Sequence, residues 1–258
     1  MLSELRKLIQ NANMDYDKVQ LYPEGGIIFL EDLVSAEVGK LTPMEFLLQA
    51  EHDYDIGGQT ALLNSLTNSK RAIQCQIDQW IQAFGFETSK TTKKKIEIIN
   101  EIGYAPRILR KVSDARNLLE HEYRLPNIEI VEEALDLAWL FISSSLGAQI
   151  PSDIYAVNDD SEIKIKKDSN VISLFQSGLH FELDEKIKTI SVIAFEANKG
   201  TGFKEKTTAQ IVVKSTDPIY LLILRLMFAI HLNADYRIDK AFDVFWNTVH
   251  GTKQHSLK

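Results

Sequence analysis

The chain has 258 residues, a formal net charge of −7 and a hydrophobic fraction of 45%. These values are those of an ordinary globular protein, so they exclude an intrinsically disordered or fibrous chain. The single cysteine, Cys75, excludes a disulfide within the chain, which is typical of a reducing compartment. The length fits one large domain or two ordinary ones.

No stretch of the sequence reaches the roughly 18 apolar residues that a membrane-spanning helix needs. The closest run, residues 219–232, is interrupted by Arg225 and His231 and is expected to be a buried helix. The start of the chain is charged and lacks the apolar stretch of a secretory signal. We therefore expect a cytoplasmic protein without a membrane partner.

Residues 1–41 are expected to form a short helix followed by a β-hairpin. Apolar residues recur at helical spacing over residues 2–9. Apolar β-formers at 19–22 and 27–30 flank the Pro/Gly turn signal of residues 23–26, which predicts two paired strands.

Residues 42–147 are expected to form an all-helical bundle of four or five helices. Thr42-Pro43 is typical of an N-cap followed by proline at the first helical position. Apolar residues then recur every three or four positions to about residue 84, with Gly57-Gly58 as a break or bend. Cys75 falls in this apolar pattern and is expected to be a packed core thiol. Further helices are expected at 96–102, 107–123 and 130–146.

Residues 148–258 are expected to form an α+β region. Turn residues separate five apolar stretches that predict an antiparallel meander, and two helical patterns follow them. The strands are expected at 163–165, 171–175, 179–183, 187–195 and 209–213, and the helices at 219–232 and 239–249. The whole chain is therefore expected to be of the α+β class.

The segment from Arg116 to Tyr123 contains a cation, an amide, an imidazole and a phenol within about two helical turns. Cleavage of RNA without a metal needs a group that exchanges a proton near neutral pH, and histidine suits that role. It also needs a cation that stabilises the negative charge at phosphorus, for which arginine is well suited. His121 and Arg116 are the candidates.

Helical geometry separates these two residues. Arg116 and His121 are five positions apart, which is about 140° around an ideal helix. Asn117 and His121 are four apart and share a face. One helix therefore does not direct Arg116 and His121 at the same phosphate, whereas two copies of the helix that meet in a homodimer complete the site.

This segment resembles the HEPN superfamily, whose hallmark is an arginine, four to six residues and a histidine, often with a polar residue after the arginine. Asn117 occupies that polar position between Arg116 and His121. With Tyr123 the segment matches the R-x4-H-x-Y version found in HEPN toxins that are paired with nucleotidyltransferase antitoxins. The resemblance covers about residues 42–147. The N-terminal section and the C-terminal α+β region depart from those short, single-domain toxins.

The resemblance implies a metal-independent endoribonuclease that needs no cofactor, acts on RNA as a homodimer, and serves as a toxin or in antiviral defence. It implies that Arg116, Asn117 and His121 form the catalytic site in the dimer cleft. It also implies that a nucleotidyltransferase antitoxin modifies Tyr123.

Basic residues gather around this segment. Residues 90–124 contain nine basic and five acidic residues, a net charge of +4 in an acidic protein, which is compatible with phosphate contact. Arg107, Arg110 and Lys111 precede the motif by one to two turns and are candidates for RNA binding. The run of residues 93–95 is interpreted either as a further RNA contact or as a solvated helix start.

Other interpretations of the same residues stay open. Arg116 and Glu120 are spaced as a helical ion pair, which would make the segment an ordinary polar face. The protein would then be a non-catalytic HEPN module that binds RNA or a nucleotide or dimerises, with a C-terminal sensor, or a structural interaction protein. No metal site is expected, because the remaining histidines lack metal-ligand spacing. They are His52, His180, His231, His250 and His255.

Overall fold

A computed structural model of the chain describes residues 1–33, 40–103, 127–167, 170–197, 205–231 and 235–251. These residues form both helices and antiparallel strands, so the expected α+β class is confirmed. The chain divides into two compact units, which are residues 29–148 and residues 1–28 together with 149–258. This division differs from the three expected segments, because the N-terminal residues belong to the same unit as the C-terminal region.

The unit of residues 1–28 and 149–258 is built on a five-stranded sheet with the strand order β1-β2-β5-β6-β7. The strands are β1 Val19–Phe29, β2 Gln149–Asn158, β5 Ser177–Asp184, β6 Thr189–Ala197 and β7 Glu205–Lys214. Ile154, Phe181, Val192 and Ile211 lie in one row across β2, β5, β6 and β7. Because side chains alternate between the faces of a strand, this register places one apolar face against the core.

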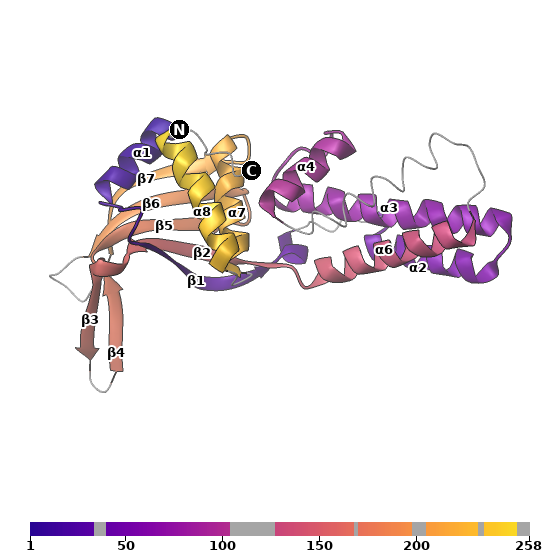
Figure 1. Ribbon diagram of the computed structural model, residues 1–258, viewed down its shortest axis with the longest axis horizontal. Helices are drawn as coiled ribbons and strands as arrows, with labels where there is room; N and C mark the ends of the chain where they lie inside the picture. The colour runs from indigo at the N-terminus through magenta and orange to yellow at the C-terminus, as the bar shows by residue number, and fades with distance from the viewer. Residues whose placement is uncertain (34–39, 104–126, 168–169, 198–204, 232–234, 252–258) are drawn as a thin grey trace. The chain divides into compact units, whose positions relative to one another are not determined.

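Three helices cover the same face of this sheet (Figure 1). They are α1 Leu2–Asn11, α7 Pro218–His231 and α8 Asp235–His250. In α8 the buried residues Ala241, Phe245 and Val249 recur every four positions, as expected for the inner face of a helix. The rings of Phe245 and Phe181 meet edge to face with centroids 5.9 Å apart, which joins the helical layer to the sheet.

The expected hairpin near the N-terminus is wrong. Residues 19–29 form the single strand β1, which continues through the Pro/Gly segment and pairs with β2. Gly25 has φ +79°, and the amide of Gly26 donates to the hydroxyl of Ser152 at 3.0 Å. The segment therefore bends the strand without reversing it, because its polar groups bond to β2 instead of to a neighbouring part of β1.

The expected meander is also interrupted. The short helix η2 Asp159–Ser161 leads into β3 Glu162–Lys167 and β4 Asn170–Phe175, which form a two-stranded sheet of their own. The five-stranded sheet instead includes β2, which the sequence did not predict. Pro151 and Asp153 lie in β2, and both residue types are depleted in strands.

The unit of residues 29–148 is helical in its described part. It contains η1 Leu30–Leu33, α2 Pro43–Ile56, α3 Gln59–Ala83, α4 Thr92–Ile102 and α6 Ile128–Leu146. A capping box begins α2, since the Thr42 hydroxyl accepts from the Glu45 amide at 3.2 Å and the Glu45 carboxylate accepts from the Thr42 amide at 2.7 Å. Gly57 and Gly58 separate α2 from α3 with φ of +71° and +83°, a region that favours glycine.

Helix α3 is central to this unit, because it packs against α2, α4, α6 and η1. Its apolar residues Ile73, Ile77, Trp80 and Ile81 are almost fully buried. The rings of Trp80 and Phe141 of α6 lie with centroids 6.2 Å apart. Burial of such large side chains stabilises the unit by about 1.5–3 kcal/mol for each of them.

In the described ranges, no helix combines the length and the apolar character that a membrane span requires. The apolar run that begins at residue 219 lies in α7, which has 14 residues and is therefore about 21 Å long. Its residues Ile223, Leu224 and Met227 are completely buried, as expected for a core helix.

A substitution at Gly178 would test the packing of the sheet. A Cβ at this position would lie 2.7 Å from the carbonyl oxygen of Ala156 and 2.6 Å from Val157. Since the backbone of β2 cannot move aside without breaking its ladder, we expect Gly178→Ala to lower the free energy of unfolding by about 1–3 kcal/mol. Urea unfolding followed by circular dichroism measures this change.

Gly26→Ala is the matched control in the same sheet, because its Cβ would meet only the Ser152 hydroxyl, at 3.9 Å. Equal unfolding midpoints for Gly178→Ala and Gly26→Ala would contradict the packing described for β5.

Candidate functional site

The residues predicted to act on RNA all fall between α4 and α6. They lie within residues 104–126, outside the described residues, so the geometry of this predicted site stays a prediction. These residues are Arg107, Arg110, Lys111, Arg116, Asn117, His121 and Tyr123.

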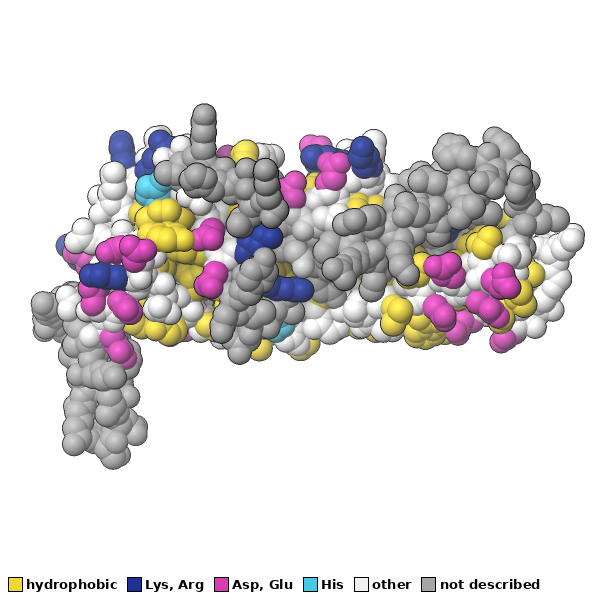
Figure 2. Space-filling view, viewed as in Figure 1, with side chains coloured by type: hydrophobic (Ala, Val, Ile, Leu, Met, Phe, Trp, Pro, Cys, Tyr) yellow, Lys and Arg dark blue, Asp and Glu magenta, His cyan; other side chains and the backbone are white. Residues whose placement is uncertain are grey.

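Two described helices of this unit, α2 and α6, are strongly acidic. Helices α2 and α6 together contain eight Asp or Glu residues and no Lys or Arg. Acidic side chains gather over the part of this unit where α2 and α6 lie (Figure 2). A surface of this kind repels phosphate, so contact with a nucleic acid is disfavoured over these two helices.

The three lysines of residues 93–95 do not form one exposed surface. The side chain of Lys95 is only 7% exposed, and its Nζ lies 2.7 Å from Oδ1 of Asp78 on α3. Lys94 pairs with Glu97 of the same helix at 3.1 Å. Both interpretations of the run are therefore wrong for Lys95, which links α4 to α3, and only Lys93 and Lys94 are exposed.

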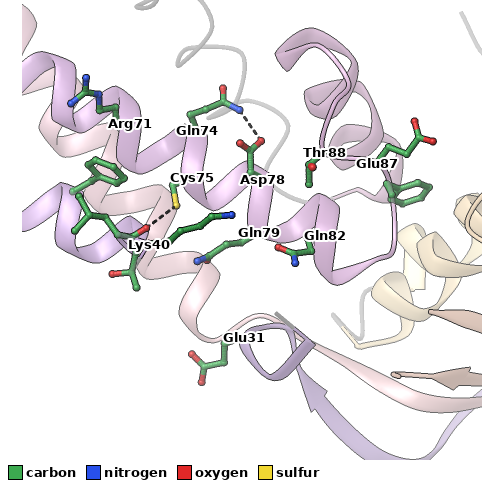
Figure 3. A pocket seen from close by; sticks show the side chains of 14 residues that line it. Glu31, Lys40, Arg71, Gln74, Cys75, Asp78, Gln79, Gln82, Glu87 and Thr88 are labelled. Atoms are coloured by element: carbon green, nitrogen blue, oxygen red, sulfur yellow. Dashed lines mark hydrogen bonds between the residues drawn. The ribbon is translucent and has the colours of Figure 1, made fainter. Parts of the chain in front are cut away.

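Asp78 is the centre of a polar network between α3 and α4. Its Oδ1 accepts a hydrogen bond from the Gln74 amide at 2.9 Å in addition to the contact with Lys95 (Figure 3). The amide oxygen of Gln74 in turn accepts from the Thr92 hydroxyl at 3.1 Å. This network satisfies the buried ammonium group, which would otherwise be costly to remove from water.

A hollow of about 960 Å³ lies along the polar side of α3. Its walls include Gln79 and Gln82 of α3, and Glu31 and Lys40 lie across from them (Figure 3). Its size falls within the range of about 300–1,000 Å³ that is typical of small-molecule sites. The lining contains both acidic and basic side chains together with amides, which favours a polar ligand without a large net charge.

A second hollow of about 260 Å³ adjoins the first, because both are lined by Glu31, Thr42 and Gln79. Its walls are mainly apolar and include Leu30, Pro43, Met44, Trp80, Ile142 and Leu146. We call the two hollows together the α3 groove. The groove thus offers apolar walls at one end and amides along one side.

Cys75 lines the larger hollow and is half-buried, in contrast to the expected packed core thiol. Its Sγ lies 3.6 Å from the carbonyl oxygen of Leu41. Burial raises the pKa of the Cys75 thiol, Asp78 raises it further, and Lys40 opposes both effects. The thiol is therefore protonated at neutral pH and is a poor nucleophile.

A separate polar cluster lies on the sheet of the other unit. Nε2 of His180 is 2.9 Å from Oδ1 of Asp153, and the Ser152 hydroxyl donates to Oδ2 of the same carboxylate at 2.6 Å. Tyr155, directly opposite His180 in the register, stacks on the imidazole with centroids 4.4 Å apart. Because the serine bonds to the aspartate and not to the histidine, this cluster orients His180 but does not activate a serine nucleophile.

Close approach of β1 to this cluster requires a glycine. A Cβ at Gly25 would lie 2.1 Å from Oδ2 of Asp153, so only glycine leaves room for the carboxylate. The sequence alone did not reveal the cluster, because the register that pairs β2 with β5 is not encoded in any local motif. Among the described residues, no group of three or more His, Cys, Asp and Glu side chains could hold a metal ion.

Comparisons with protein-family models, curated proteins and solved structures find no match to this chain. The α3 groove was not predicted, although Gln76, Gln79 and Gln82 follow each other at three-residue spacing along the second half of α3. That spacing is the one signal from which it could have been found.

The raised pKa of Cys75 predicts slow alkylation. Because less thiolate is present at a given pH when the pKa is higher, the folded protein should react with iodoacetamide more slowly than the urea-unfolded protein. The rate should also reach half of its maximum at a higher pH in the folded protein. Mass spectrometry of the alkylated protein between pH 7 and pH 10 measures both quantities.

Cys75→Ser controls for alkylation of other side chains, since Cys75 is the only cysteine. A half-maximal pH that is equal to or below that of the unfolded chain would contradict the described burial of the thiol.

Proposed function

We propose that this protein is an endoribonuclease of the HEPN type that cleaves RNA without a metal or a cofactor. The observation that carries the proposal is the segment Arg116-Asn117-x3-His121-x-Tyr123 in a unit whose described part is helical. In this proposal the unit is an HEPN-like bundle, and residues 107–123 supply a further helix between α4 and α6.

The chain position of the segment supports this proposal. It follows three described helices and precedes α6, which has 19 residues and ends the unit. The motif would thus lie on the second-last long helix of the bundle, as in the HEPN family. The acidic character of α2 and α6 also supports it, because an RNA strand would be directed toward the basic segment that contains the motif.

The proposed chemistry uses two side chains from different copies of the chain. His121 of one copy takes the proton of the ribose 2′-hydroxyl or gives a proton to the leaving 5′-oxygen. Arg116 of the other copy binds the phosphate and stabilises the charge that develops at phosphorus. Asn117, one turn from His121, is placed to orient the imidazole or the phosphate.

In this proposal the protein is a cytoplasmic homodimer that serves as a toxin or in antiviral defence. Arg107, Arg110 and Lys111 hold the RNA backbone, since each cation that neutralises a phosphate releases a counterion. Tyr123 is the residue that a nucleotidyltransferase antitoxin would modify. A non-catalytic module that binds RNA is the second candidate, because the α3 groove is of a size that suits a ligand and its lining lies outside the motif.

The direct test is cleavage of cellular RNA in the presence of EDTA. Loss of the imidazole should lower the rate of His121→Ala by about 10²–10⁴-fold relative to the wild type, the usual contribution of general acid–base catalysis. Gel electrophoresis of the RNA with time measures the rate.

His52→Ala is the matched control, because His52 is exposed on α2 of the same unit and should cleave as the wild type does. Cleavage at equal rates by His121→Ala and the wild type would contradict the catalytic proposal. Binding of RNA that is lost in Arg116→Ala, without cleavage by the wild type, would instead favour the non-catalytic module.

A further inference from the structure

Three glutamine side chains form a row along α3. Gln76, Gln79 and Gln82 follow each other at three-residue intervals, so each is a surface neighbour of the next and the row winds about 120° around the helix over about 9 Å. We call them the amide row. None of the three amides has a hydrogen-bond partner among the described residues. They differ in this from Gln74, whose amide is bonded at both ends.

All three amides line the α3 groove. Gln76 and Gln79 line the smaller hollow, and Gln79 and Gln82 line the larger one. Gln79 and Gln82 extend toward the side where Lys40 and Glu31 lie, whereas Gln74 and Asp78 are bonded to each other elsewhere on the helix (Figure 3). The groove therefore has unbonded donors and acceptors along one wall.

Gln76 is the least exposed residue of the amide row, at 7%. Its amide is not among the fully buried side-chain atoms that lack a partner, so the amide is reached from the smaller hollow that it lines. A ligand in the groove that supplies a donor and an acceptor would therefore bond to this amide in place of solvent.

The charges of the groove narrow the class of ligand. Lys95 neutralises Asp78, and Lys90 lies 3.4 Å from the carboxylate of Glu87. The remaining charged side chains of the lining are Glu31, Lys40 and Arg71, a net charge of only +1, so the groove does not favour a strongly anionic group. Apolar walls next to amides suit instead a neutral, planar heterocycle with a donor and an acceptor side by side.

Adenine fits this description. A glutamine amide bonds to it in bidentate fashion, donating to N7 and accepting from the N6 amino group. Its faces are apolar enough to contact walls such as those of the smaller hollow, and single-stranded RNA presents unstacked bases to proteins in this way. We propose that the amide row recognises an unstacked adenine of single-stranded RNA. The assignment of RNA as the source of the adenine rests on the proposed function.

The test measures base-selective binding without cleavage. Fluorescence anisotropy would follow the binding of 2′-O-methyl oligoadenylate and oligocytidylate, which lack the 2′-hydroxyl that cleavage requires. Gln76→Met and Gln79→Met keep the length of the side chain and remove its amide. Each should weaken binding of oligoadenylate by about 5- to 150-fold, the usual range for a bidentate base contact, and leave oligocytidylate binding unchanged.

Gln59→Met is the matched control, because Gln59 is exposed at the start of α3 and lines neither hollow. It should bind both oligonucleotides as the wild type does. Equal affinity of the wild type for the two oligonucleotides would overturn the proposal. An equal loss of affinity for both oligonucleotides in Gln79→Met would also overturn it. So would binding of a peptide in the groove by a protein that has no affinity for adenine.

Free adenosine monophosphate distinguishes the two sources of the base. Binding of this nucleotide without binding of oligoadenylate, with loss in Gln79→Met, would overturn the assignment to RNA. The proposed nuclease function is tested independently of the amide row. Absence of cleavage together with adenine-selective binding would reject the catalytic function and support the amide row, whereas cleavage without base selectivity would reject only the amide row.

Discussion

Burial of the apolar side of α3 holds the helical unit together. Trp80, Ile77 and Ile81 fill the space between α3 and the helices that pack on it, and the contact of Trp80 with Phe141 fixes α6 against this core. Trp80 also lines the smaller hollow of the α3 groove, next to Gln76 and Gln79, whereas Gln82 lines the larger hollow. One helix therefore supplies both core side chains and the amides of the groove.

Acidic and basic residues lie in different segments of the same unit. Helices α2 and α6 contain Asp and Glu but no Lys or Arg, and the pairing of buried Lys95 with Asp78 removes one lysine from the surface. What remains positive is concentrated in the segment that contains Arg116 and His121. A phosphate-bearing substrate is therefore favoured at that segment and disfavoured over α2 and α6. The α3 groove complements this arrangement, since its amides suit a base and not a phosphate.

Local patterns in the sequence predicted the elements whose boundaries are set locally. The capping box at Thr42 and the glycines at 57–58 mark the limits of α2, and α7 follows from its apolar run. Features that depend on distant partners were missed or mistaken. The segment with Gly25 has the composition of a turn, and its hydrogen bond to Ser152 is not visible in the sequence. Strand β2 contains Pro151 and Asp153, whose residue types are depleted in strands. The pairing of His180 with Asp153 needed the register of β2 and β5, which only the assembled sheet defines. The motif residues lie outside the described part of the chain, so their arrangement is known only from their spacing.

The central claim is that Arg116 of one copy and His121 of another act on the same phosphate. Mixing Arg116→Ala with His121→Ala, after dissociation and reassembly of the dimers, tests it most directly. If the site is shared, half of the reassembled dimers are mixed and each retains one intact site of two, so the mixture should recover about a quarter of the wild-type cleavage rate, although neither variant cleaves alone. A mixture as inactive as the two separate variants would contradict the shared site.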